Sequence, residues 1–347
     1  MNFLKNKSIL ITGGTGSFGS RLLNRLVSIK KDTPKKVIVF SRDELKQYEL
    51  SQEFPEKDFP QLRYFLGDIR DKQRLKMAFE NVDYVIHAAA LKQVPTAEYN
   101  PFEFIKTNII GAQNIIEACI QTNVKKVIAL STDKAAAPIN LYGATKLCSD
   151  KLFISANNIV GKKKIVFSIV RYGNVLMSRG SVIPKFIEDI KAKRTLNITH
   201  PEMTRFNITI DEGVNFVINS LANSIGGEIF IPKLPSFKVI DLLKCFDYKV
   251  KHKISGIRPG EKLHEEMITL SDSYNTIESK KFFIILPHQG KSLSDKKRTI
   301  SQYMKRFSAK KPKIPYSYNS KDNKDFLSIN KLKKIILEQK SKHNLDN

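Results

Sequence analysis

The sequence predicts a doubly wound α/β fold, in which a parallel β-sheet carries helices on both faces and a smaller second lobe follows it. Short apolar runs typical of buried strands alternate with helical segments up to residue 170. A glycine-rich run follows the first of these strands and opens the first helix. After Arg171 the alternation stops, and glycine and proline residues separate shorter elements.

Six apolar runs are expected to form the strands of the sheet. They cover residues 7–12, 37–40, 62–66, 82–90, 127–130 and 165–170. Helices are expected at residues 20–29, where the apolar positions recur at helical spacing, at residues 100–123, and around Tyr142. Because strands joined through helices pair in parallel, this order predicts a sheet wound on both faces.

The chain is expected to divide into three parts. Residues 1–170 form the sheet domain, and segments near 205–225 pack back on it. Residues 171–290 form mainly the second lobe, which covers the carboxyl ends of the strands, where such sheets bind ligands. Residues 291–347 form a basic C-terminal extension with a polar loop at 316–325 and a short helix at 329–337.

The composition is that of a protein with a large core and a strong positive charge. The 347 residues are 41% hydrophobic and carry a formal charge of +25. From residue 291 to the end there are 16 Lys and Arg against 5 Asp and Glu. This excess is mostly lysine without interleaved aromatic residues, so we interpret it as a solvated tail rather than a nucleic-acid interface. A positive field also suits a dianionic substrate.

Other classes of protein are disfavoured by what the sequence lacks. No apolar run approaches the ~20 residues of a membrane helix. The first residues lead directly into a strand without a signal peptide, so we expect a cytoplasmic protein. Cys119, Cys148 and Cys245 have neither paired nor metal-ligand spacing, which predicts reduced thiols and no metal site.

The glycine-rich run predicts a dinucleotide-binding site of the Rossmann type. Glycines permit a tight turn and a close approach to a pyrophosphate, and the following helix offers its N-terminal N–H groups. The strand–loop–helix context makes this motif specific. The expected cofactor contacts in this run are Gly13, Thr15, Gly16, Ser17, Phe18 and Gly19.

The end of the second strand indicates which nicotinamide cofactor binds. Ser41, Arg42 and Lys46 form a cradle for the 2′-phosphate of NADP. Asp43, counted among the cofactor contacts, and Glu44 would instead suit the ribose hydroxyls of NAD. We therefore favour NADP over NAD.

The third strand is closed by a dipeptide that could reach the adenine ring. Asp68 and Ile69 follow residues 62–66 and are expected to contact the adenine of the cofactor. For Asp68, a plain turn cap is an equally good interpretation.

Two short runs carry the catalytic chemistry. Tyr142 and Lys146 are four residues apart, so a helix places them on one face, where the ammonium would lower the pKa of the phenol. Such a pair alone is usually an exposed helix pair, but here it follows a dinucleotide loop. Thr132, Asp133 and Lys134 follow the fifth strand. Asp133 and Lys134 add the second acid and base that a dehydration needs, although a structural ion pair is the alternative.

With these motifs the chain resembles the extended short-chain dehydrogenases/reductases. Within them it is similar to the UDP-N-acetylglucosamine 4,6-dehydratases that invert C5 and begin pseudaminic acid biosynthesis. The similar segments are 13–19, 41–47, 67–71, 88–95, 131–135, 140–147, 171–175, 178–181, 203–206 and 256–265. The dTDP-glucose dehydratases typically have Thr-Asp-Glu in place of residues 132–134, and UDP-sugar 4-epimerases lack the Asp-Lys pair. Membrane-bound relatives often carry methionine in place of Tyr142.

The resemblance implies a mechanism for these residues. Tyr142, assisted by Lys146 and Thr132, takes the sugar O4 proton while NADP accepts the C4 hydride. Lys134 removes the C5 proton, Asp133 protonates the departing O6, and water leaves. The hydride then returns to C6, and C5 is reprotonated from the opposite face, a step we assign to Lys134. The product is UDP-2-acetamido-2,6-dideoxy-β-L-arabino-hex-4-ulose.

The resemblance also implies further contacts. Ala88, Tyr142 and Lys146 would touch the cofactor, and Lys92 would lie between cofactor and substrate. The expected contacts of the UDP-N-acetylglucosamine substrate are Asn174, Val175, Ser178, Arg179, Gly180, Ser181, Thr204, Arg258 and Glu261. Thr204 and Arg258 would lie near the diphosphate, and Glu261 near the uridine ribose. For Arg258, the alternative interpretation is a salt bridge to Glu261 or Glu265.

Several alternatives stay open at this point. A UDP-sugar 4-epimerase, a dehydratase that retains C5, or an NADP-binding RNA-associated scaffold would share much of this pattern. The resemblance implies a homo-oligomer, a dimer-based hexamer, but no residue pattern shows it.

Overall fold

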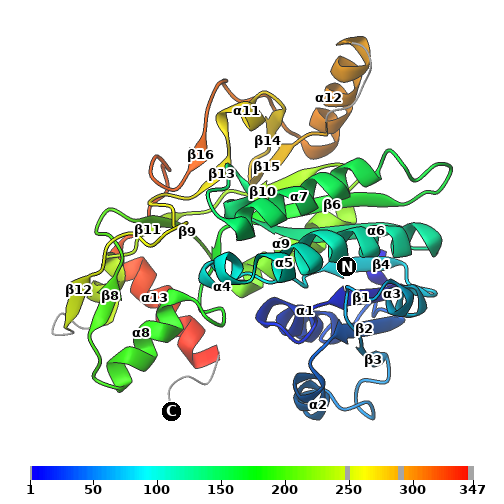
Figure 1. The fold of residues 1–347 in the computed structure, drawn as a ribbon. Helices are drawn as coiled ribbons and strands as arrows, with labels where there is room; N and C mark the ends of the chain where they lie inside the picture. Colours follow the sequence, from blue (N-terminus) through cyan, green and yellow to red (C-terminus); the bar gives the residue numbers. More distant parts are fainter. Residues whose placement is uncertain (1, 247–250, 288–292, 343–347) are drawn as a thin grey trace.

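The computed structural model of the protein describes residues 2–246, 251–287 and 293–342 (Figure 1). Its centre is a nine-stranded sheet in the order β14-β15-β10-β6-β5-β4-β1-β2-β3. The strands from β3 to β10 pair in parallel. The predicted doubly wound fold is therefore confirmed.

The sheet reverses its strand order beside β1. Its parallel strands are β1 (Ser8–Thr12), β2 (Lys36–Ser41), β3 (Leu62–Leu66), β4 (Tyr84–His87), β5 (Lys126–Thr132), β6 (Val166–Tyr172) and β10 (Ile229–Pro232). The antiparallel strands β14 (Thr276–Glu278) and β15 (Phe282–Ile285) extend one edge. Because β2 and β4 flank β1, the carboxyl ends of β1 and β4 form the crevice where ligands of such sheets bind.

Helices cover both faces of the sheet. On one face α3 (Lys72–Phe79), α6 (Gly111–Gln121) and α7 (Leu141–Ala156) lie side by side. On the other, α1 (Ser17–Val27) packs against α9 (Ile210–Asn223). The helix α2 (Glu44–Glu53) follows β2.

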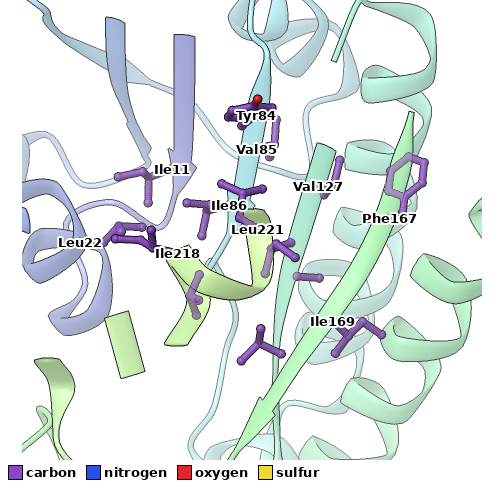
Figure 2. Close-up of a cluster of buried hydrophobic side chains, with 14 of the residues drawn as sticks. Ile11, Leu22, Tyr84, Val85, Ile86, Val127, Phe167, Ile169, Ile218 and Leu221 are labelled. Carbon is purple, nitrogen blue, oxygen red and sulfur yellow. The ribbon is translucent and has the colours of Figure 1, made fainter. Parts of the chain in front are cut away.

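The core lies between the sheet and these helices. Figure 2 shows Ile11 of β1 and Ile86 of β4 close to Leu22 of α1 and Ile218 of α9. All four side chains are at most 3% exposed. Strands covered on both faces have continuous apolar runs, which is why these segments were recognisable in the sequence.

The helix predicted at residues 100–123 is interrupted. The structure has α4 (Val94–Tyr99), α5 (Pro101–Phe104) and a π-helical segment (Ile105–Ile110) before α6. Asn108, in the π-helical segment, bonds both backbone groups of Leu91 and the hydroxyl of Thr145. The irregular turn therefore fixes the chain that follows β4 to α7.

The smaller lobe contains two short sheets and three helices. The first sheet has the strands β11 (Ser236–Lys238), β9 (Thr204–Ile208) and β7 (Asn174–Val175). The second sheet pairs β12 (His252–Ile254) with β8 (Leu196–Ile198). The helices are α8 (Val182–Lys191), α10 (Asp241–Phe246) and α13 (Ile329–Lys342). The remaining elements are α11 (Leu270–Ser273), α12 (Leu293–Phe307) and the pair β13 (Glu266–Ile268) and β16 (Tyr318–Asn319).

The expected boundary between the sheet domain and the lobe needs correction. The strands β10, β14 and β15 lie in the main sheet, although residues 171–290 were assigned mainly to the lobe. A strand pattern identifies a strand but not the sheet it joins, because pairing partners are distant in sequence.

The C-terminal extension is not a solvated tail where the structure describes it. Tyr303 and Phe307 of α12 join the core of the sheet domain, and Leu332 and Ile336 of α13 are buried in the core of the lobe. The prediction was wrong because net charge hides amphipathicity: a helix rich in lysine can still bury apolar side chains such as Phe307 and Leu332. The expected polar loop at 316–325 contains β16 and a fully buried Ser320.

Candidate active site

A cleft of about 810 Å³ opens at the carboxyl ends of the parallel strands. Its walls come from the glycine-rich loop, from the ends of β2, β4, β5 and β6, and from lobe segments around residues 173–183 and 258–262. Most residues predicted for the cofactor, the chemistry and the substrate line this one cleft; Asp68 and Thr204 are the two that do not.

The glycine-rich loop fits a pyrophosphate group. The helix α1 begins after Gly16, without a side-chain cap and without an acidic residue in its first turn, so its N–H groups remain available to an anion. Gly13 has a φ of 68°, which favours glycine. A Cβ on Gly19 would lie 2.4 Å from the Gly13 carbonyl oxygen. The loop can therefore pack this tightly only with glycine at these positions.

At the end of β2, Arg42, Asp43 and Lys46 all line the cleft, and Asp43 also caps α2. Asp43 accepts the backbone N–H of Lys46 at 3.0 Å and pairs with its ammonium. The hydrogen bonds from Lys46 lower the pKa of Asp43. The Ser41 hydroxyl accepts a hydrogen bond from the Gln47 amide at 2.9 Å. Arg42 is half exposed and lies 3.6 Å from Asp68.

Asp68 lies outside the cleft lining. Its carboxylate accepts the backbone N–H of Arg70 at 2.9 Å and two further bonds from the Arg70 guanidinium. Its neighbour Ile69 and, after β4, Ala88 do line the cleft. Asp68 therefore caps the turn that follows β3, which was the alternative interpretation of this residue.

The five predicted catalytic residues come together at the end of β5. Thr132 is the last residue of β5, and Asp133 and Lys134 form the 3₁₀ turn after it. The Lys134 ammonium lies 3.1 Å from Asp133 Oδ1, and the Thr132 hydroxyl donates to the same oxygen at 2.9 Å.

The helix α7 presents Tyr142 and Lys146 to this turn. Asn140 caps α7 by accepting the N–H of Gly143 at 2.7 Å, and its amide donates to the carbonyl of Gly260 in the lobe. A Cβ on Gly143 would lie 2.2 Å from the Lys134 carbonyl oxygen, so glycine lets the helix approach the turn.

The electrostatic role expected for Lys146 is not what the structure shows. Burial raises the pKa of Tyr142 to about 12, opposed by the Lys134 charge and a hydrogen bond with Thr132. The Lys146 amine donates to the Leu130 carbonyl at 2.8 Å, and burial lowers the pKa of Lys146, opposed by Asp150. Helical spacing predicted a shared face correctly but not where the amine points.

Among the cleft residues that sequence reasoning missed, Glu265 and Arg205 contact the predicted catalytic residues or each other. Glu265 Oε1 lies 2.9 Å from the Lys134 ammonium and 3.7 Å from Arg205 Nε. Asp133 and Glu265 are each 1% exposed, and each has one buried carboxylate oxygen without a hydrogen-bond partner. Glu265 ends the segment 256–265, where it was considered only as a partner of Arg258.

The loop after β7 joins the lobe to the cofactor loop. The Lys92 amine donates to the Arg179 carbonyl at 3.2 Å, and the Arg179 N–H donates to the Ser17 hydroxyl at 3.3 Å. The other predicted substrate contacts of this region also line the cleft: Asn174, Val175, Ser178, Gly180 and Ser181.

Of the residues predicted to contact the uridine diphosphate, Arg258 and Glu261 line the cleft and Thr204 does not. Thr204 is buried and bonds His264 at 2.8 Å and Ser320 at 2.7 Å, while its neighbour Arg205 lines the cleft. β-strand alternation turns consecutive side chains to opposite faces, so a shift of one residue exchanges their roles. Arg258 makes the ion pair that was its alternative interpretation, to Glu261 at 2.8 Å and 3.0 Å, and both line the cleft.

The described residues contain neither a metal-binding cluster nor a membrane-spanning helix. Within residues 2–246, 251–287 and 293–342 no three His, Cys, Asp or Glu side chains gather as metal ligands. Across the same ranges no helix is both long and apolar enough to span a bilayer.

Comparison with known proteins places the chain in a family. Residues 9–287 match the family described as polysaccharide biosynthesis protein. The chain belongs to this family. A UDP-N-acetylglucosamine 4,6-dehydratase (inverting) of Campylobacter jejuni is 51% identical over 331 residues, which cover 95% of this chain and 97% of the relative. The predicted resemblance to these dehydratases is thereby confirmed.

Two further proteins are similar to this chain over most of its length. A Rickettsia bellii protein named UDP-glucose 4-epimerase is 39% identical, with 96% of each chain covered. Among solved structures, Pen from Bacillus thuringiensis has a TM-score of 0.86 and 38% identity, covering 97% of this chain and 99% of its own.

Proposed function

We propose that the protein is an NADP-dependent dehydratase that converts UDP-N-acetylglucosamine to UDP-2-acetamido-2,6-dideoxy-β-L-arabino-hex-4-ulose, the first step of pseudaminic acid biosynthesis. The observation that carries this proposal is the Asp133–Lys134 pair, joined at 3.1 Å beside Tyr142 in the cleft that also contains the glycine-rich loop. The similarity to the Campylobacter jejuni dehydratase supports it.

The residues at the end of β2 support NADP. Asp43, the residue that could bind the ribose hydroxyls of NAD, is committed to capping α2. Arg42 and Lys46 line the cleft beside Ser41 and would hold a 2′-phosphate. When bound, NADP would accept the hydride from C4 of the sugar and later return it to C6.

Tyr142 is the proposed base for the sugar O4 proton. Its hydroxyl bonds Thr132, and this bond and the Lys134 charge favour the phenolate that takes the proton, against burial, which raises the pKa of Tyr142 to about 12. Thr132 orients the hydroxyl, and Lys146, whose amine donates to the Leu130 carbonyl, lines the cleft one helical turn further on.

Asp133 and Lys134 are the proposed acid and base of the elimination. Burial and the charge of Glu265 raise the pKa of Asp133, which suits a carboxylic acid that must donate a proton to the leaving O6. Lys134, in its neutral form, takes the C5 proton that the C4 ketone has acidified. Lys134 is also the proposed donor that reprotonates C5.

The 4-epimerase named among the relatives is the second candidate. Epimerisation at C4 needs a base for O4 but no acid for O6 and no base for C5. The buried Asp133–Lys134 pair would then have only a structural role. Its placement in the cleft, with an unpartnered carboxylate oxygen on Asp133, favours dehydration.

The test is incubation of the protein with UDP-N-acetylglucosamine and NADP in deuterated water, followed by proton NMR. A new C6 methyl signal, deuterium at C5 and inverted C5 are expected. UDP-N-acetylgalactosamine would show an epimerase, and an uninverted C5 a retaining dehydratase. Either result contradicts the proposal.

Two variants and a binding measurement complete this test. Asp133→Asn and Lys134→Gln should each lower dehydration about 10²–10⁴-fold while cofactor affinity stays close to that of the wild type. Equal affinities for NAD and NADP would contradict the proposed role of Arg42 and Lys46.

We also propose that the protein acts as a homo-oligomer, as the resemblance implies. Light scattering coupled to size exclusion should give a multiple of the chain mass of 39.6 kDa. A monomer at assay concentration would contradict this.

A further inference from the structure

A second carboxylate reaches the Asp133–Lys134 pair from a distant part of the chain. Glu265 immediately precedes β13, and its Oε1 lies 2.9 Å from the Lys134 ammonium. Lys134 also lies 3.1 Å from Asp133 Oδ1, so one amine sits between two carboxylates that are each 1% exposed. This arrangement is more than the proposed acid and base require.

Resting on the proposed function, we propose that Glu265 is a positioning residue for the elimination: it holds the Lys134 amine against Asp133 and sets which of the two carries their shared proton. The ammonium–carboxylate form of the pair differs from its reactive amine–carboxylic acid form by one proton moved along the 3.1 Å contact.

The proton count of the step agrees with this role. The neutral Lys134 amine takes the C5 proton, and the electrons of the C5–H bond form the C5–C6 double bond. The C6–O6 bond breaks, and O6 leaves as water with the proton from Asp133. The pair ends as ammonium and carboxylate with the same total number of protons, and the Lys134 ammonium is again opposite Glu265.

The negative charge of Glu265 acts on both members of the pair. A nearby anion favours the protonated form of a neighbouring group. Burial and Glu265 raise the pKa of Asp133. Burial would lower the pKa of Lys134, but Asp133 and Glu265 together raise it. Glu265 thus opposes loss of the shared proton to solvent.

Other charged groups face this cluster from several elements. Arg205 of β9 lies 3.7 Å from Glu265 and 3.6 Å from Glu261. Burial alone would raise the pKa of Glu265, but Lys134 and Arg205 hold it below its usual value, so Glu265 stays ionised. The remaining titratable groups that interact with the cluster are Lys92, Tyr142 and Lys262.

Glu265→Gln removes the charge and keeps the size of the side chain. Competitive acetylation with acetic anhydride over a pH series, read by peptide mass spectrometry, reports the pKa of Lys134 without any substrate. The expected pKa in the variant is at least about one unit lower than in the wild type. The pH profile of kcat should shift to lower pH on both limbs, and kcat should fall about 10²-fold.

Two further variants separate charge from structure. Glu265→Asp keeps the charge and should keep the wild-type position of the pH profile, even with a lower kcat. Glu266→Gln removes the neighbouring carboxylate, whose side chain bonds Ser317 instead, and should leave both the Lys134 pKa and the profile unchanged.

An unchanged Lys134 pKa and an unshifted profile in Glu265→Gln would overturn the proposal, even if kcat fell, because that is the result of a merely structural contact. Wild-type protein that leaves UDP-N-acetylglucosamine intact would instead overturn the proposed function. The acetylation series still decides in that case whether Glu265 sets the charge of Lys134.

Discussion

His87 is the last residue of β4, and its ring is only 2% exposed. Its Nδ1 lies 2.8 Å from the Thr12 hydroxyl, and burial, with a smaller effect of Lys146, lowers the pKa of His87 to about 3. Among the groups that the structure describes, no acidic side chain lies beside His87 to stabilise a positive charge on its ring. Lys134, in contrast, lies between two carboxylates. His87 is therefore a buried neutral strand residue.

This difference gives a prediction for stability against pH. Below its usual pKa of about 6.5 the unfolded chain binds a proton at His87, while the folded chain does not until about pH 3. The free energy of unfolding therefore decreases as the pH falls through this window. At about pH 5 the loss from His87 is about 2 kcal/mol.

Urea unfolding at about pH 7.5 and about pH 5 measures the decrease in the free energy of unfolding between the two pH values. This decrease should be about 2 kcal/mol smaller in His87→Gln than in the wild type. Identical pH dependence in the wild type and His87→Gln would contradict the buried neutral state.

At the scale of elements, the approach of α1 to its loop can be tested with a pair of glycines. In Gly19→Ala the new Cβ would lie 2.4 Å from a backbone oxygen of Gly13, which cannot move aside like a side chain. We expect a loss of about 1–3 kcal/mol in stability and at least about ten-fold weaker NADP binding. Isothermal calorimetry and urea unfolding measure the two effects.

Gly213→Ala is the matched control for this prediction. Gly213 is also a buried helical glycine, in α9, but the nearest atom to its added Cβ is at 3.8 Å. Alanine should stabilise this helix by about 0.5–1 kcal/mol and leave NADP affinity unchanged. Equal NADP affinity in both variants would show that the glycine loop does not depend on close packing.

Elements were predictable where the pattern was local. The strands β1 to β6 stand out because burial on both faces needs continuous apolar runs, and α13 stands out by its helical spacing. The π-helical segment was missed because its extra residue per turn is imposed by the contacts of Asn108 with Leu91 and Thr145. Contacts between distant residues leave no periodicity in the sequence.

For the whole molecule, motifs predicted the contents of the cleft better than its charges. The resemblance and the spacing placed Thr132, Asp133, Lys134, Tyr142 and Lys146 in one cleft, as found. Glu265 and the direction of the Lys146 amine required the fold, because the lobe and α7 decide them. A pKa depends on burial and on partners from other elements, which no single motif contains.

The positive charge of the whole chain bears on how an anionic ligand reaches the cleft. The chain carries a formal charge of +25, and the described cleft adds several cations to its walls. They include Arg42, Lys46, Lys92, Lys134, Lys146, Arg179, Arg205, Arg258 and Lys262. Such a field concentrates an anionic ligand at the cleft, and salt screens it.

We therefore expect the affinity for UDP, measured by calorimetry, to fall at least about three-fold when sodium chloride rises from about 50 mM to about 500 mM. Uridine shares the base and ribose but lacks the diphosphate, so its affinity should change little. Arg258→Gln should reduce the salt dependence for UDP, since it removes one cation from the wall. If UDP and uridine responded equally to salt, the positive charge of the chain would have no part in binding the nucleotide, and recognition would depend on contacts with uridine alone.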